Sequence, residues 1–179
     1  MKSELREVIM AIPKLSIPLS CLLLVMLASV LFASDIPGPL KSRFVTGDPV
    51  WKEIPVRDDL RNQYEKCWQT AVATILENNF DIATMDKDSG YARTTWNSGV
   101  VTLGGNWSYT VQISIKFVFL PSDSKSPTDA ARGVDKVRVQ AAGAIVESKR
   151  GRVLKNLRGY DQVVLQDLFQ DLQAKLAAH

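Results

Sequence analysis

The chain has 179 residues, of which 23% are charged and 46% hydrophobic, and its formal net charge is +3. This balance is ordinary for a globular protein, so it excludes a largely disordered chain. It also lacks the strongly basic character of a nucleic-acid-binding protein.

The first 34 residues are predicted to direct export. Residues 17–32 (IPLSCLLLVMLASVLF) are almost continuously apolar, follow Lys14 and lead into Ala33-Ser34. A basic start, an apolar run and small residues at its end are the parts of a secretory signal peptide. The apolar run also approaches the roughly 20 residues that span a bilayer, so an uncleaved N-terminal membrane anchor is the alternative.

Residues 35–56 are predicted to form an extended tether. They contain four prolines (Pro37, Pro39, Pro49 and Pro55), and proline favours extended backbone over helix. A single domain is then expected over residues 57–179.

The domain is predicted to open with an amphipathic helix that starts after Asp58 as N-cap. A carboxylate at this position can accept the free N–H groups of the first turn. Apolar residues recur at three- and four-residue spacing, which places them on one face of a helix. They are Leu60, Tyr64, Cys67, Trp68, Ala71, Ile75 and Leu76.

A hairpin is expected next, with strands at residues 80–86 and 91–96. The intervening Lys87-Asp88-Ser89-Gly90 has the composition of a tight turn. Ala92, Thr94 and Trp96 are expected to face the core, because alternate residues of a strand point to the same side.

Two further strands are predicted. Residues 107–119 (WSYTVQISIKFVF) alternate strictly between apolar and polar side chains, which indicates one buried and one solvated face. Residues 136–146 form the next expected strand, with Val137, Val139 and Ala141 pointing inward. Residues 121–132 are polar and read as a loop.

Residues 147–158 (ESKRGRVLKNLR) are basic and show little periodicity, so we expect a loop. Such a loop could be merely solvated, or it could contact anionic lipid headgroups, peptidoglycan or an acidic partner. The candidate contact residues are Lys149, Arg150, Arg152, Lys155 and Arg158.

A last helix is expected after Asp161 as N-cap, with its apolar face formed by Val164, Leu165, Leu168, Phe169, Leu172 and Leu176. The predicted order is therefore α-β-β-β-β-α. Short connections between consecutive strands favour an antiparallel meander. We expect an α+β fold in which a four-stranded antiparallel sheet packs against two amphipathic helices.

Few residues are suited to catalysis. The only histidine is the terminal His179, and Cys67, on the apolar helix face, is expected to be a small buried side chain. No cysteine and histidine residues have metal-ligand spacing. A hydrolase that uses its scattered aspartates is an alternative. We expect a protein that is not an enzyme and has no cofactor.

Residues 64–96 resemble a pattern of bacterial envelope lipoproteins of the BamC-like type. In that pattern a helix leads to a strand, an Asp…Gly turn and a strand ending in Thr-x-Trp, here Asp86, Gly90, Thr94 and Trp96. The resemblance implies a helix-grip fold and an exported, periplasmic or membrane-associated accessory module that binds other envelope proteins, in a bacterium. The lipidated cysteine of that family is missing after the leader, where Ala33-Ser34-Asp35 stand.

Overall fold

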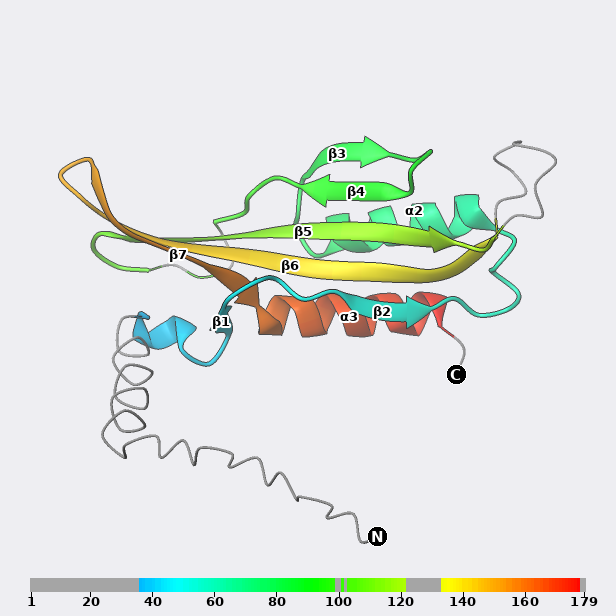
Figure 1. Cartoon of the computed structure of the whole chain (residues 1–179), viewed down its shortest axis with the longest axis horizontal. Coiled ribbons are helices and arrows are strands. Elements are labelled where there is room, and N and C mark those ends of the chain that lie inside the picture. The colour runs from blue at the N-terminus through cyan, green and yellow to red at the C-terminus, as the bar shows by residue number, and fades with distance from the viewer. Residues whose placement is uncertain (1–35, 99–100, 102, 122–132, 178–179) are drawn as a thin grey trace, which may run out of the picture. The chain divides into compact units, whose positions relative to one another are not determined.

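A computed structural model of the chain describes residues 36–98, 101, 103–121 and 133–177 (Figure 1). The leader predicted at residues 1–34 and the terminal His179 lie outside the described residues. Internal contacts divide the chain into residues 1–36 and residues 37–179, and every element below belongs to the second unit. Among the described residues, no helix combines the length and apolar character needed to cross a membrane.

The elements begin with a short 3-10 helix, η1 (Gly38–Leu40), and two short strands, β1 (Phe44–Thr46) and β2 (Lys52–Pro55). Helix α2 (Tyr64–Glu77) and the hairpin of β3 (Ile82–Asp86) and β4 (Tyr91–Thr94) follow. The three longest strands come next, β5 (Trp107–Phe119), β6 (Val134–Lys149) and β7 (Arg152–Asp161). Helix α3 (Gln162–Leu176) is the last element.

All seven strands belong to one antiparallel sheet with the order β1-β7-β6-β5-β4-β3, and β2 pairs with β6. Strand β7 pairs with residues 142–149 of β6, whereas β2 pairs with residues 136–139. Strand β7 does not extend along residues 136–139 of β6, because the chain turns into α3 after Asp161. Strand β2 pairs with this part of β6 instead.

The predicted four-stranded sheet in the order α-β-β-β-β-α is wrong. Residues 35–56, expected to be a tether, contribute β1 and β2, and residues 147–158, expected to be a loop, lie mostly in β6 and β7. Strands β1, β2 and β7 are short or lack a regular alternation of apolar and polar residues. Their backbone hydrogen bonds to β6 and β7 hold them in the sheet, and sequence periodicity does not report such pairing.

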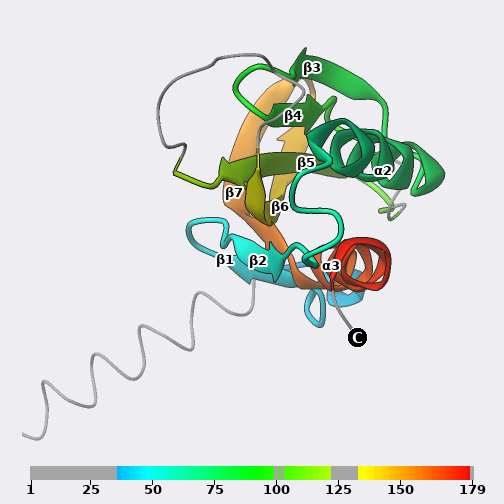
Figure 2. The same cartoon turned by 90° about the vertical axis from the view of Figure 1, so that its right-hand side faces the viewer.

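Both helices cover the same face of the sheet (Figure 2). Helix α2 packs on β5 through aromatic contacts, with the rings of Tyr64 and Trp68 centred 5.5 and 5.6 Å from that of Phe117. Helix α3 buries Leu165, Leu168, Leu172 and Leu176. The strands supply alternate buried residues, including Val111, Ile113 and Ile115 of β5 and Val137, Val139 and Ala141 of β6.

Most of the expected core is confirmed, with local differences. Leu76 is 52% exposed although it was placed on the apolar helix face, and Trp96 is 49% exposed although it was placed in the core. Helix α2 begins at Tyr64 with Gln63 at the N-cap, so the expected start after Asp58 is wrong. Residues 57–63 form turns instead, in which Leu60 and Gln63 donate backbone hydrogen bonds to Arg57 and Leu60.

A pair of glycines allows β1 to lie against the sheet. Gly143 of β6 and Gly159 of β7 are opposite each other in the register. The ring of Phe44 fills the space above them: a Cβ atom on either glycine would lie 2.9 Å from a ring carbon. A Cβ on Gly159 would also lie 2.0 Å from the carbonyl oxygen of Val45. Only glycine fits at this position.

Candidate functional site

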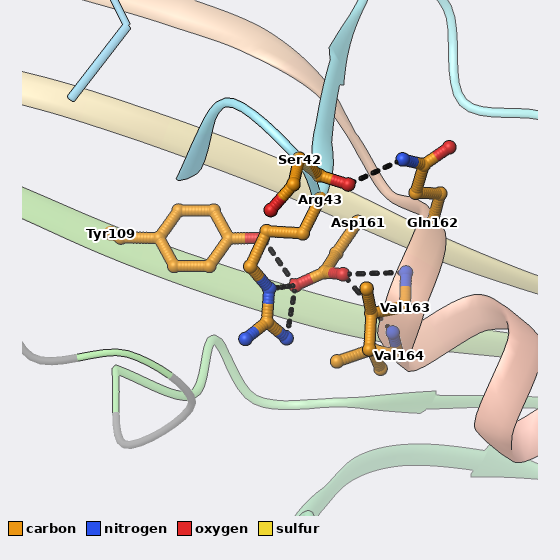
Figure 3. Close-up of polar contacts among 7 residues, drawn as sticks. All are labelled: Ser42, Arg43, Tyr109, Asp161, Gln162, Val163 and Val164. Atoms are coloured by element: carbon orange, nitrogen blue, oxygen red, sulfur yellow. Dashed lines mark hydrogen bonds and ion pairs between the residues drawn. The ribbon is translucent and has the colours of Figure 1, made fainter. Parts of the chain in front are cut away.

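A buried polar cluster is centred on Asp161, at the junction of β7 and α3 (Figure 3). Its side chain is fully buried. Oδ1 accepts hydrogen bonds from the N–H groups of Val163 (2.9 Å) and Val164 (3.0 Å), so the predicted N-cap is confirmed. Oδ2 accepts from Arg43 Nε (2.9 Å) and from the hydroxyl of Tyr109 (2.6 Å), and Arg43 Nη2 lies 2.8 Å away.

These contacts give the Asp161 cluster a structural role. They join the segment before β1, the start of β5 and the N-terminus of α3. Gln162 adds two bonds at the same junction: its backbone N–H donates to the carbonyl of Arg43, and its side-chain Nε2 donates to the carbonyl of Ser42. Both oxygens of this buried carboxylate are already occupied by hydrogen-bond and ion-pair partners, so it has little capacity left for a substrate.

Tyr109 in this cluster is expected to make stability pH-dependent in alkaline solution. Burial, together with the neighbouring Asp161 carboxylate, raises the pKa of Tyr109 above its ordinary value. In the unfolded chain that pKa is about 10. The stabilisation is therefore complete below about pH 10 and is lost as the pH rises further, because the unfolded chain then releases the proton.

The measurement is urea unfolding of the wild type and of Tyr109→Phe as the pH is raised through 10. The variant lacks the titrating hydroxyl, so its free energy of unfolding should decline less steeply. Tyr160→Phe, which removes a hydroxyl outside the cluster, serves as the control. Equal alkaline slopes for the wild type and Tyr109→Phe would contradict the prediction.

The five basic candidate residues lie on a β-hairpin. Lys149 ends β6 and Arg152 begins β7, and the two are opposite each other. Between them Arg150 and Gly151 have φ angles of 52° and 76°. Two successive residues with positive φ are typical of the type I′ turn, whose twist matches that of the strands it joins.

The structure brings three of these residues together and separates the other two. Lys149, Arg150 and Arg152 are exposed around the turn, and none forms an ion pair with another described residue. Lys155 pairs in register with Glu147, and Arg158 pairs with Ala144. Because alternate residues point to the same side, Lys155 and Arg158 lie on opposite faces of the sheet.

Two exposed aliphatic side chains adjoin the basic turn, and sequence reasoning missed them. Val153 is 64% exposed and Leu154 is 58% exposed. A register shift between Glu147 and Ser148 leaves Leu154 as the extra residue of a β-bulge opposite them. The sequence indicates this apolar pair only through the adjacent Val and Leu within a basic run that shows little periodicity.

A second exposed surface lies on the face of the sheet that neither helix covers. Glu53 of β2 is opposite Arg138 and forms ion pairs on this face, with Arg138 Nη2 at 2.6 Å and Lys136 Nζ at 2.7 Å. Trp51, two residues before Glu53, lies on the same side by strand alternation and is 40% exposed.

Trp96 lies on the same face as Trp51, but it follows β4, so β5 and β6 separate the two tryptophans. The next residue, Asn97, is bridged to the buried Val111, and its amide donates to the carbonyl of Asn79 at the end of α2. Asn97 thus points toward the helices, and from its bridge to Val111 we infer that the adjacent, 49% exposed Trp96 points away from them.

Two glutamine side chains that lie between the tryptophans hold the backbone close to each tryptophan. Gln112 Nε2 on β5 donates to the carbonyl of Thr94 (2.9 Å), and Gln140 Nε2 on β6 donates to the carbonyl of Pro49 (2.8 Å). Each bond holds a segment two residues away from one tryptophan. We refer to Trp51, Trp96, Gln112 and Gln140 as the tryptophan face.

The remaining candidates for chemistry have structural explanations. Cys67 is confirmed as a buried side chain, and its burial raises the pKa of the thiol. Asp86 accepts a hydrogen bond from the N–H of Ser89 (3.1 Å), which confirms it as a turn residue, and the bonds from Ser89 lower its pKa. Within the described ranges, no three His, Cys, Asp or Glu side chains are grouped as metal ligands would be.

No protein-family model matches the chain, and no curated protein is significantly similar to it. The resemblance to BamC-like proteins therefore stays a prediction from residues 64–96.

Proposed function

We propose that the chain is a non-enzymatic protein of the bacterial cell envelope that acts as a binding or accessory module for other envelope proteins. The observation that carries this proposal is the tryptophan face, where two large aromatic side chains are 40% and 49% exposed. The export signal predicted at residues 1–34 and the resemblance of residues 64–96 support it from the sequence.

The composition of the tryptophan face suits protein recognition. Tryptophan and arginine are the side chains most enriched at the energetic centres of protein interfaces. Arg138 lies on the same face, on the strand that also carries Gln140. Trp51 precedes β2 and Trp96 follows β4, so β6 and β5 lie between them and the separation across the sheet is about 14 Å. A patch of this width fits inside a standard interface of roughly 800 Å² per partner.

Docking on the tryptophan face is tested by placing a photoreactive amino acid at position 96 of the full chain in cells. We expect a discrete adduct with an envelope protein. Adding Trp51→Ala should lower its yield at least about fivefold, because truncating one aromatic hot-spot residue typically costs more than 1 kcal/mol.

The matched control is Leu76→Ala, which truncates a similarly exposed apolar side chain on α2. It should leave the adduct at position 96 unchanged. An adduct that is insensitive to Trp51→Ala, or an equal yield when the photoreactive group is placed at position 76, would show that the tryptophan face does not select a partner.

A second candidate function is binding to anionic lipid or peptidoglycan through the basic residues of 149–158. The observation that favours it is the grouping of Lys149, Arg150 and Arg152 around one exposed turn.

A further inference from the structure

We propose that the tip of the β6–β7 hairpin, residues 149–154, docks on a bilayer surface that contains anionic lipid. In this arrangement Val153 and Leu154 enter the headgroup region, while Lys149, Arg150 and Arg152 contact lipid phosphates. The proposal rests on the second candidate function and commits it to one ligand, the anionic phospholipid bilayer.

The hairpin tip extends beyond the rest of the sheet. The last pair between β5 and β6 is Trp107 with Glu147, and the last backbone bond from outside the hairpin joins Ser148 N–H to the carbonyl of Asn106. Residues 149–152 lie past both contacts, and Val153 and Leu154 lie level with them on β7. Figure 1 shows the turn at the end of the sheet away from α2 and α3. The tip can therefore reach a planar surface before the helices do.

The charges at the tip are available to such a surface. All three cations are exposed and form no ion pair with other described residues. Each lysine or arginine close to an anionic leaflet strengthens binding about fivefold, so three together contribute roughly 100-fold.

The two aliphatic side chains decide between lipid and the other anionic partners. Peptidoglycan and polar polyanions offer no apolar interior into which Val153 and Leu154, 64% and 58% exposed in water, could be transferred. A protein partner needs roughly 800 Å² of complementary surface, which a single narrow turn does not supply. A bilayer surface accommodates a convex tip and provides both phosphates and acyl chains.

Arg150 lies in the turn itself, beyond the last strand pair of Lys149 with Arg152. Arg150 has a φ of 52°, in the left-handed region where asparagine or glycine is more favourable. The chain thus has a long cationic side chain at a position whose backbone favours a different residue. A function for that side chain in contact with a ligand explains the choice.

The test measures whether the tip itself enters the bilayer, and it uses the full chain so that any contribution of residues 1–34 is common to all variants. An environment-sensitive fluorophore is attached at Leu154→Cys in a Cys21→Ser background, where the buried Cys67 is protected from labelling. Phosphatidylcholine vesicles are compared with vesicles that also contain about 30% phosphatidylglycerol.

With phosphatidylglycerol present, accessibility of the fluorophore to an aqueous quencher should fall about fivefold, because the probe enters the interface. Without it, accessibility should stay as in buffer. A fluorophore at Leu76→Cys on α2 should remain accessible in both vesicles.

Charge reversal at Lys149, Arg150 and Arg152 to glutamate should restore full accessibility at position 154, since the tip's partitioning falls by at least roughly 100-fold. Reversal of three other exposed cations, Lys66, Arg93 and Lys116, makes the same change in net charge and should leave the protection intact. Unchanged circular dichroism and thermal midpoints confirm that both triple variants are folded.

Three results would overturn the proposal. The first is equal accessibility of position 154 in both vesicles, and the second is protection that survives reversal of the tip charges. The third is co-sedimentation with purified peptidoglycan that the tip reversal abolishes while position 154 stays accessible in vesicles, which would assign the cations to the cell wall. Cross-linking from position 96 is measured separately, so failure of lipid docking is distinguishable from failure of protein docking.

Discussion

Replacing Asp161 with alanine is expected to lower the free energy of unfolding by about 3–5 kcal/mol, the usual cost of removing one partner from a buried ion pair. The substitution leaves the guanidinium of Arg43 and the hydroxyl of Tyr109 without their acceptor, and it removes the cap from the first turn of α3. Chemical denaturation of the full chain measures the loss.

The control is Asp167→Ala, which removes an exposed carboxylate from the same helix. It should change the free energy of unfolding by no more than about 0.5 kcal/mol. If the free energy of unfolding of Asp161→Ala were within 1 kcal/mol of that of the wild type, the hydrogen bonds and ion pair of Asp161 would not stabilise the fold as expected.

Replacing Gly159 with alanine is expected to destabilise the protein by about 3 kcal/mol, the upper end of the usual range for overpacking. The added Cβ would lie 2.0 Å from the backbone oxygen of Val45, which cannot move aside by a change of rotamer. Strand β1 must therefore separate from β7. Hydrogen exchange should show this directly, with faster exchange of the β1 amides and unchanged exchange in β5.

Alanine substitutions at two other glycines should have smaller effects and serve as comparisons. The Cβ of Gly143→Ala would lie 2.9 Å from the ring of Phe44 and at an ordinary contact distance, 3.6 Å, from the backbone nitrogen of Asp161, so it should cost less than Gly159→Ala. Gly104→Ala meets no atom within 4 Å and should be nearly neutral. Equal effects at Gly159 and Gly104 would contradict the close approach of β1.

The parts of the fold that could be predicted are those in which one residue pattern determines the element. Strand β5 was predicted with its observed bounds, because its strict alternation reflects one face packed under the helices and one exposed. The start of α3 was predicted from Asp161, since capping is local chemistry. Strands β1, β2 and β7 were missed because they are short or lack a regular apolar alternation, and their pairing with β6 and β7 is not visible in the sequence.

The candidate site was predicted only in part. The charges of the hairpin are visible in the sequence. Their grouping depends on a turn at Arg150 and Gly151, where the sequence has neither proline nor asparagine to indicate a turn. The exposure of Val153 and Leu154 depends on a bulge, which shifts the register by one residue. The tryptophan face could not be predicted, because Trp96 changes sides of the sheet where pairing is irregular between Thr94 and Asn97.

The place of β2 beside β6 has a consequence for the order of folding. Glu53 and its partner Lys136 are 83 residues apart in sequence, and Arg43 and Asp161 are 118 apart. Strands β1 and β2 therefore find their partners only after nearly all of the remaining strands have been made. Contacts of such long range form slowly. Strands β1 and β2 therefore stay unpaired until β6 and β7 have been made, so the sheet is completed only at the end of synthesis.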